Sequence, residues 1–161
     1  MTQTHVHLLI THLPIFGSVL GAFVLAYGIW TKSNHTVIAA FNVFIISAIG
    51  ASIAYLTGEG AEESVENLQG VIKATIKQHE EFAVYALISL IILGVSSIAG
   101  IFLVLRKPTT TKTSAIVILF ISLISFGLVA TTGYLGGQIR HTEISTSAPA
   151  PPENGEKETD H

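Results

Sequence analysis

Residues 82–105 read FAVYALISLIILGVSSIAGIFLVL and contain no Asp, Glu, Lys or Arg. Three further stretches, 8–30, 37–56 and 115–135, are equally free of charge. About 20 apolar residues in a helix cross a hydrocarbon core about 30 Å thick, so each stretch is long enough to span a membrane. Helices of a soluble bundle keep a polar stripe, and these stretches have none. The sequence therefore predicts an all-α integral membrane four-helix bundle in a lipid bilayer.

The overall composition agrees with a membrane protein and narrows the chemistry. Only 12% of the 161 residues are charged, against about 25% in a typical soluble domain, and the mean hydropathy is +0.60. The chain has no cysteine, which excludes disulfides, iron–sulfur clusters and covalently attached haem. Any metal must therefore be held by nitrogen or oxygen atoms. The sequence shows no phosphate loop and no catalytic nucleophile. We expect an electron-transfer or metal-binding protein rather than a stand-alone enzyme, with no nucleic-acid partner.

The three connections between the apolar stretches differ in length. Residues 31–36 and 106–114 are short and polar, with Thr36 and either Thr113 or Ser114 available as N-caps. Residues 58–81 form a longer connection, in which apolar side chains recur at helical spacing among charged ones. This pattern predicts an amphipathic helix over about 61–78, lying in the membrane interface between the second and third spans. A solvated loop is the alternative.

Beyond residue 143 the composition shifts to Ser, Thr, Pro and Glu. Such a segment cannot bury enough apolar surface to order itself. We expect a four-span domain over 1–143, followed by a disordered polar tail over 144–161.

The topology follows from the even number of spans. Four crossings return the chain to its starting side, so both termini and residues 58–81 share one face. Four basic residues, Lys32, Arg106, Lys107 and Lys112, lie on the opposite face, where the sequence has no acidic residue. Basic residues near helix ends favour the cytoplasmic side. We therefore expect a multi-pass protein of the bacterial inner membrane with both termini in the periplasm. The first span has no basic residue before it, which favours a retained helix over a cleaved signal peptide.

Five histidines fall on the face that carries the termini: His5, His7, His12, His79 and His141. His35 lies on the opposite face, and His161 is in the tail. His12 should sit about 7.5 Å deeper than His7 at 1.5 Å rise per residue. An ionisable side chain at such depth usually marks a functional site facing the bundle interior. The predicted cofactor or metal ligands are therefore His7, His12, His79 and His141, whereas His5 and His35 are read as interfacial residues.

Small residues accompany these histidines. Ala83 and Ala86 follow the face of His79, and Gly133 and Gly137 precede His141 at helical spacing. They could leave room for a flat macrocycle or allow close helix packing, as could Gly17 and Gly21 in a GxxxG pattern. Pro14 cannot donate to the carbonyl of Ile10, so we also expect a kink in the first helix near His12.

Three occupants of this site are chemically reasonable. Two imidazoles from facing helices can ligate the iron of b-type haem. Three or four imidazoles could instead bind copper or zinc, and Glu59, Glu63 or Glu80 could complete a non-haem iron site. The third reading has no cofactor and treats the histidines as anchors at the membrane interface.

The same residues carry a resemblance to a known family. The segment His7-Leu-Leu-Ile-Thr-His12-Leu-Pro14-Ile15 resembles a motif, close to His-Pro-x-x-x-His-Phe-Pro-Ile, of the membrane-protein family catalogued as domain of unknown function 2231. Thr57-Gly58, His79 and the segment from Gly136-Gly137 to His141 resemble its later motifs. Leu8 and Thr142 stand where the family has proline and glycine. The resemblance covers residues 6–143 and implies His7, His12, His79 and His141 as site residues.

Members of that family resemble small quinone or haem proteins, and some are joined to c-type cytochromes. The resemblance thus implies an electron-transfer role. Together with the histidines, it predicts a membrane electron-transfer protein with b-type haem near the periplasmic face. Its partner would be a quinone or a cytochrome, within a respiratory assembly, another membrane complex or a homo-oligomer. The alternatives are a histidine-based copper, zinc or iron protein and a cofactor-free structural subunit.

Overall fold

The structure, a computed structural model, describes residues 2–63 and 72–140. In chain order its helices are α1 (Gln3–Ile10), α2 (His12–Thr31), α3 (Asn34–Glu63), α4 (Lys73–Arg106), the short 3-10 helix η1 (Pro108–Thr110) and α5 (Thr111–Arg140). α1 and α2 together make one crossing, and α3, α4 and α5 with η1 make three more. All four crossings are long and apolar enough to span a membrane. The predicted all-α four-helix bundle is confirmed.

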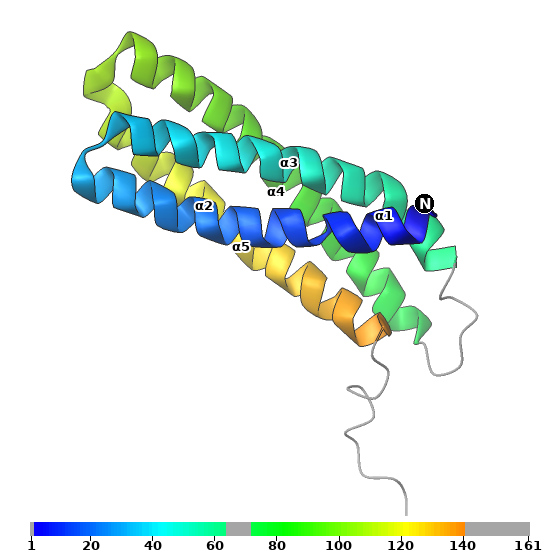
Figure 1. The fold of residues 1–161 in the computed structure, drawn as a ribbon. Helices are drawn as coiled ribbons and strands as arrows, with labels where there is room; N and C mark the ends of the chain where they lie inside the picture. Colours follow the sequence, from blue (N-terminus) through cyan, green and yellow to red (C-terminus); the bar gives the residue numbers. More distant parts are fainter. Residues whose placement is uncertain (1, 64–71, 141–161) are drawn as a thin grey trace, which may run out of the picture.

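The helices run antiparallel, and each packs against its neighbours around the bundle in the order α2, α3, α4, α5 (Figure 1). α1 continues the direction of α2 and packs mainly on α3. The turns at residues 31–36 and 106–112 lie together at one end, called here the short-loop end. The start of α1, the end of α3, the start of α4 and the end of α5 lie at the other, called the histidine end.

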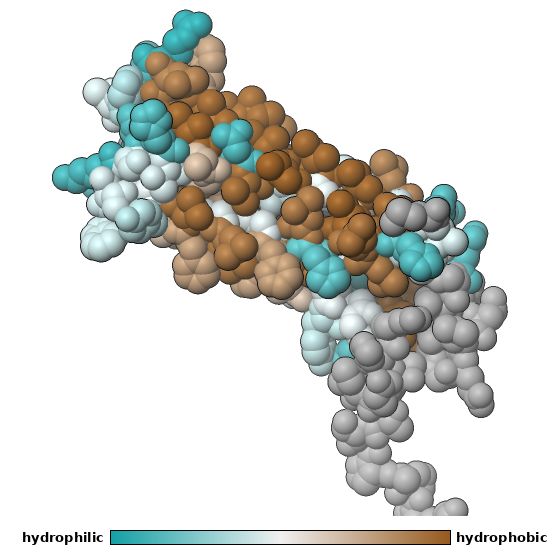
Figure 2. Space-filling model, in the orientation of Figure 1, coloured by the Kyte–Doolittle hydropathy of each residue, from teal (hydrophilic) through white to brown (hydrophobic). Residues whose placement is uncertain are grey.

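The bundle has an apolar interior and an apolar exterior. Leu25, Phe41, Phe44, Leu90 and Leu93 are fully buried between the helices, yet large side chains such as Leu9 and Trp30 are 71% and 80% exposed. Figure 2 shows a hydrophobic band across the middle of one face of the molecule, with hydrophilic residues toward both ends. Exposed apolar surface this extensive is not tolerated in water. This surface suits a lipid bilayer, in which the polar ends would lie at the two membrane surfaces.

Glycines allow α2 and α3 to approach closely inside the bundle. A Cβ at Gly17 would collide with the Oγ of Ser47, and one at Gly21 would lie 2.5 Å from the Phe44 ring. The GxxxG pattern is therefore used for packing within this chain. Gly133 has a similar role between α5 and α2, because a Cβ there would lie 3.1 Å from Cδ1 of Ile15.

The spanning helices extend further than the apolar stretches predicted. α3 continues to Glu63 and α4 already begins at Lys73. Residues 61–63 and 73–78 thus belong to spanning helices, which corrects the prediction of one separate interfacial helix over 61–78; residues 64–71 lie outside the described ones. The end of an apolar run marks the edge of the lipid. A helix can continue past that edge because its backbone hydrogen bonds are internal.

Two local expectations are also tested. The first helix is interrupted at Thr11, three residues before Pro14, as the missing proline donor predicts. The predicted N-cap Thr36 is instead the third residue of α3, and its backbone N–H donates to Oγ of Ser33 at 3.3 Å. Ser33 is therefore the cap, because α3 begins before its apolar stretch does. Likewise Thr113 and Ser114 lie inside α5.

A candidate two-histidine cofactor site

His7 ties α1 to α3 through its imidazole. Its Nδ1 lies 2.8 Å from the carbonyl oxygen of Ala54, and Oγ1 of Thr57 lies 3.5 Å from the same nitrogen. A carbonyl oxygen can only accept, so Nδ1 carries the proton and donates it. In the neutral ring the lone pair is then on Nε2. His7 is half-buried and retains one nitrogen that can bind a metal.

His79 ties α4 to α5 in the same way. Its Nδ1 donates to the carbonyl oxygen of Thr132 at 2.9 Å, and the side chain is half-buried. By the same reasoning, the lone pair of its neutral ring is on Nε2. Hydrogen bonds from Nδ1 to backbone carbonyls are the usual way in which proteins orient metal-ligating histidines.

The two contacts are built alike. In both, a histidine near the start of one spanning helix donates to a carbonyl of the next, and a glycine follows that carbonyl by four residues: Gly58 after Ala54, and Gly136 after Thr132. Residues four apart lie on the same helix face. A Cβ at Gly58 would lie 3.6 Å from Cε1 of His7, and one at Gly136 would lie 3.1 Å from Cε1 of His79. The glycines thus make room for the imidazoles.

The bundle consists of two helical hairpins. The first is formed by α1 and α2 together with α3, and the second by α4 with α5. Each hairpin contributes one histidine bound across its own helix pair at the histidine end. His7 lies on α1 and His79 lies in the second turn of α4, so both contacts are at the histidine end of the bundle. That His7 and His79 share one cofactor stays a prediction.

His12 does not join this pair, which corrects the expectation that it faces the bundle interior. It is exposed on the outer surface, and its ring stacks near that of Phe16, with centroids 6.4 Å apart. Its Nδ1 donates to the carbonyl oxygen of Leu8 at 3.0 Å, one turn earlier in the chain. Five residues turn an ideal helix by about 140° beyond a full turn, and the break at Thr11 does not bring His12 back beside His7. A neutral ring with its N–H bonded locally is tolerated there because that donor stays satisfied.

The remaining candidates are separate from the pair. His5 and His35 are exposed, as expected for interfacial residues, and Nδ1 of His5 lies 2.6 Å from Oγ1 of Thr2. Glu59, Glu63 and Glu80 are exposed too. Within residues 2–63 and 72–140, no group of three or more His, Asp or Glu side chains could hold a metal ion. His141 lies outside these residues.

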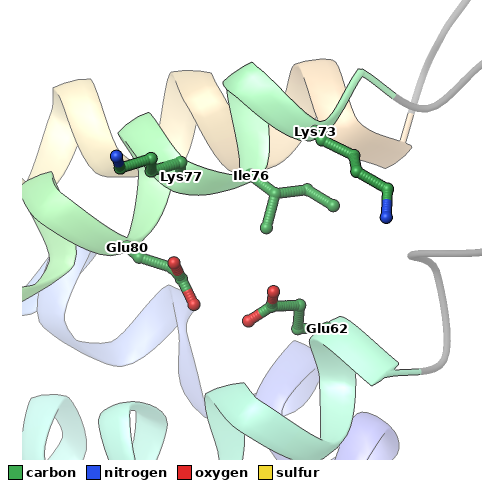
Figure 3. A pocket seen from close by; sticks show the side chains of 5 residues that line it. All are labelled: Glu62, Lys73, Ile76, Lys77 and Glu80. Atoms are coloured by element: carbon green, nitrogen blue, oxygen red, sulfur yellow. The ribbon is translucent and has the colours of Figure 1, made fainter.

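A hollow of about 260 Å³ lies between the end of α3 and the first turns of α4. Its lining residues are Glu62, Lys73, Ile76, Lys77 and Glu80. Figure 3 shows the carboxylates of Glu62 and Glu80 pointing toward each other across it. Because Glu80 follows His79 in the chain, this charged hollow borders the helical turn that carries one of the paired histidines.

The sequence predicted His7 and His79 as site residues but not the backbone carbonyls that accept their hydrogen bonds. The spacing of Ala54 to Gly58 and of Thr132 to Gly136 is common in apolar helices, and each histidine lies far from its acceptor in the chain. Comparison of the chain with protein-family models, curated proteins and solved structures gave no match. The resemblance to the domain of unknown function 2231 family therefore stays a prediction.

Proposed function

We propose that this chain is a membrane electron-transfer protein that binds b-type haem through His7 and His79. One observation carries the proposal: two imidazoles from different hairpins, both at the histidine end, each donate Nδ1–H to a backbone carbonyl and keep Nε2 for a ligand. Haem iron in cytochromes takes two axial ligands from protein side chains. A pair of oriented imidazoles matches that requirement.

The number of donors favours haem over the other candidates. Structural zinc takes four protein ligands and catalytic zinc takes three. The described residues place two oriented imidazoles at the histidine end and offer no group of three ligands. When bound, haem would supply one-electron oxidation and reduction. The chain's own contribution is to orient the two rings through Ala54 and Thr132 and to keep Cβ atoms away from them at Gly58 and Gly136.

The absorption spectrum of the purified protein tests this proposal. The protein would be expressed with an adequate supply of haem, and a Soret band with resolved alpha and beta bands on reduction is expected. His7→Ala and His79→Ala should each lose the band, because each removes one axial ligand. His12→Ala and His35→Ala are the matched controls and should keep it, because neither side chain belongs to the pair. Elemental analysis showing stoichiometric copper or zinc without haem would overturn the proposal.

The orientation in the membrane belongs to the same proposal. We place the histidine end on the periplasmic side of a bacterial inner membrane, where a quinone or a cytochrome would exchange electrons with it. The four basic residues at the short-loop end, with no acidic residue near them in the sequence, support this orientation.

Because the chain has no cysteine, orientation can be read with single cysteines and a membrane-impermeant maleimide. Glu63→Cys marks the histidine end, and Thr109→Cys marks the short-loop end; both positions are exposed. In intact spheroplasts Glu63→Cys should react at once, whereas Thr109→Cys should react only after permeabilisation. The reverse pattern would place the histidine end in the cytoplasm.

A further inference from the structure

A second hollow, of about 320 Å³, lies at the short-loop end, away from the histidines. One wall comes from the turn between α2 and α3, and the other comes from η1 and the start of α5. Its polar lining includes Lys32, Asn34, Thr109 and Lys112, and its apolar lining includes Ile29 and Val37. The hollow is therefore polar and basic on one part of its surface and apolar on another.

The two lysines come from different connections and meet at this one hollow. The sequence has no Asp or Glu before residue 59 or between residues 82 and 142, so no carboxylate belongs to either short connection. Two basic side chains at one hollow with no carboxylate beside them in the sequence make that hollow attractive to an anion. The arrangement calls for a negatively charged partner from outside the chain.

The backbone adds to this preference. α3 begins at Asn34, which lines the hollow, whereas the N–H of Thr111 at the start of α5 already donates to the carbonyl oxygen of Pro108. The N–H groups at the start of a helix carry partial positive charge and bind phosphate readily. The start of α3 and two lysine side chains therefore border one space.

We propose that this hollow binds the phosphate group of an anionic phospholipid in the leaflet at the short-loop end. Basic pockets between spanning helices at a membrane surface hold such headgroups. The side chain of Ile29 and the ring of Pro108 provide an apolar surface for the less polar part of the same lipid. A soluble phosphate has the same charged group but no part that would use this apolar surface. The site is independent of the haem proposal because it lies at the opposite end of the bundle.

Native mass spectrometry of the full chain, in a neutral detergent, can test this site. Phosphatidylglycerol, phosphatidylcholine and inorganic phosphate would be titrated separately. Lys32→Gln and Lys112→Gln should each weaken retention of phosphatidylglycerol about fivefold, the effect expected from loss of one basic residue at a charged membrane surface. The control is Arg106→Gln, which removes the same charge at the same end from a side chain that lies over the Phe102 ring and does not line the hollow.

Lys32→Gly separates binding from folding. Lys32 has a left-handed backbone (φ 55), a conformation that glycine adopts more easily, so this variant removes the charge without weakening the turn. Retention of phosphatidylglycerol that falls in the three lysine variants, but not in Arg106→Gln, supports the proposal. A matching pattern with inorganic phosphate alone would assign the same hollow to a soluble anion instead of a lipid. Equal losses in Arg106→Gln, or no loss in the lysine variants, would overturn it.

Discussion

The two ends of the bundle hold their helices together by different means. At the short-loop end the polar contacts are local: the N–H of Ser33 donates to the carbonyl of Gly28 at 3.0 Å, and the N–H of Thr36 donates to Oγ of Ser33. At the histidine end they join residues far apart in the chain. His7 reaches Ala54, His79 reaches Thr132, and Oγ1 of Thr4 donates to the carbonyl of Gly60 at 3.3 Å.

The short-loop end is held together by its turns, whereas the contacts that hold the histidine end also involve the proposed ligands. A turn of a few residues already keeps two helices adjacent, so the short-loop end needs no long-range polar contacts to stay closed. At the histidine end the described residues form no such turn between helices, and side-chain contacts join them instead. The imidazoles that join it also keep one nitrogen each for a ligand, so the same contacts assemble the helices and orient the proposed haem ligands.

The largest effect is expected from filling the space beside His79. Gly136→Val would place a branched side chain where even a Cβ comes within 3.1 Å of the ring, which should push the imidazole away from Thr132. Loss of this kind of support typically lowers metal affinity about tenfold or more. Haem content per protein, measured by the pyridine haemochromogen assay, should fall accordingly.

Gly137→Val is the matched control, because a Cβ at Gly137 meets no atom of residues 2–63 or 72–140 within 4 Å. It carries the same change in helix propensity one residue further along α5. If both variants lose haem equally, helix destabilisation and not the contact with His79 explains the loss.

A smaller effect is expected when a histidine is replaced by phenylalanine, which keeps an aromatic ring in place but cannot donate the hydrogen bond. His7→Phe should lower the free energy of unfolding by about 1 kcal/mol, because the bond to Ala54 is lost. His12→Phe should change it less, since that bond closes within one turn of its own exposed helix. Unfolding of the haem-free protein by titration of a denaturing detergent into mild micelles measures both, and a larger loss for His12→Phe would contradict the long-range role of His7.

At the short-loop end a substitution should stabilise the protein. Lys32→Gly relieves the left-handed conformation, which costs a non-glycine residue about 1–2 kcal/mol; part of that gain is offset by the greater freedom of glycine in the unfolded chain. We expect a net increase of about 1 kcal/mol in the same detergent titration, with haem content unchanged. A decrease would show that the lysine side chain contributes more to this turn than its backbone costs.

The smallest effect should distinguish the two histidine contacts from each other. A Cβ at Gly58 would be in ordinary contact with His7 at 3.6 Å, so Gly58→Ala should keep haem and gain about 0.5 kcal/mol from its better helix propensity. Gly136→Ala brings a tighter contact, 3.1 Å, and should retain less haem. The ratio of haem content in the two variants measures this asymmetry, and equal values would mean that His79 adjusts its position freely.

Much of the fold was predictable because its signals are local. Uncharged stretches located the four spans, the even number of crossings put the termini and His79 at one end, and Pro14 predicted the break near Thr11. The lengths of α3 and α4 were not predictable in this way, because a helix can run past the edge of the lipid. The position of His12 along the first span was predictable, because it follows from residue number. The direction of its side chain was not, because it depends on how α1 and α2 pack.

The sequence by itself determined that four apolar helices would form and that histidines from separate helices would gather at one end, because helix length and chain direction follow from residue order. Only the tertiary structure decided that His7 donates to Ala54 and His79 to Thr132, with Gly58 and Gly136 beside the rings. It also brought Lys32 and Lys112 to one hollow. These choices depend on which faces of neighbouring helices meet, and that is settled by packing across the whole bundle.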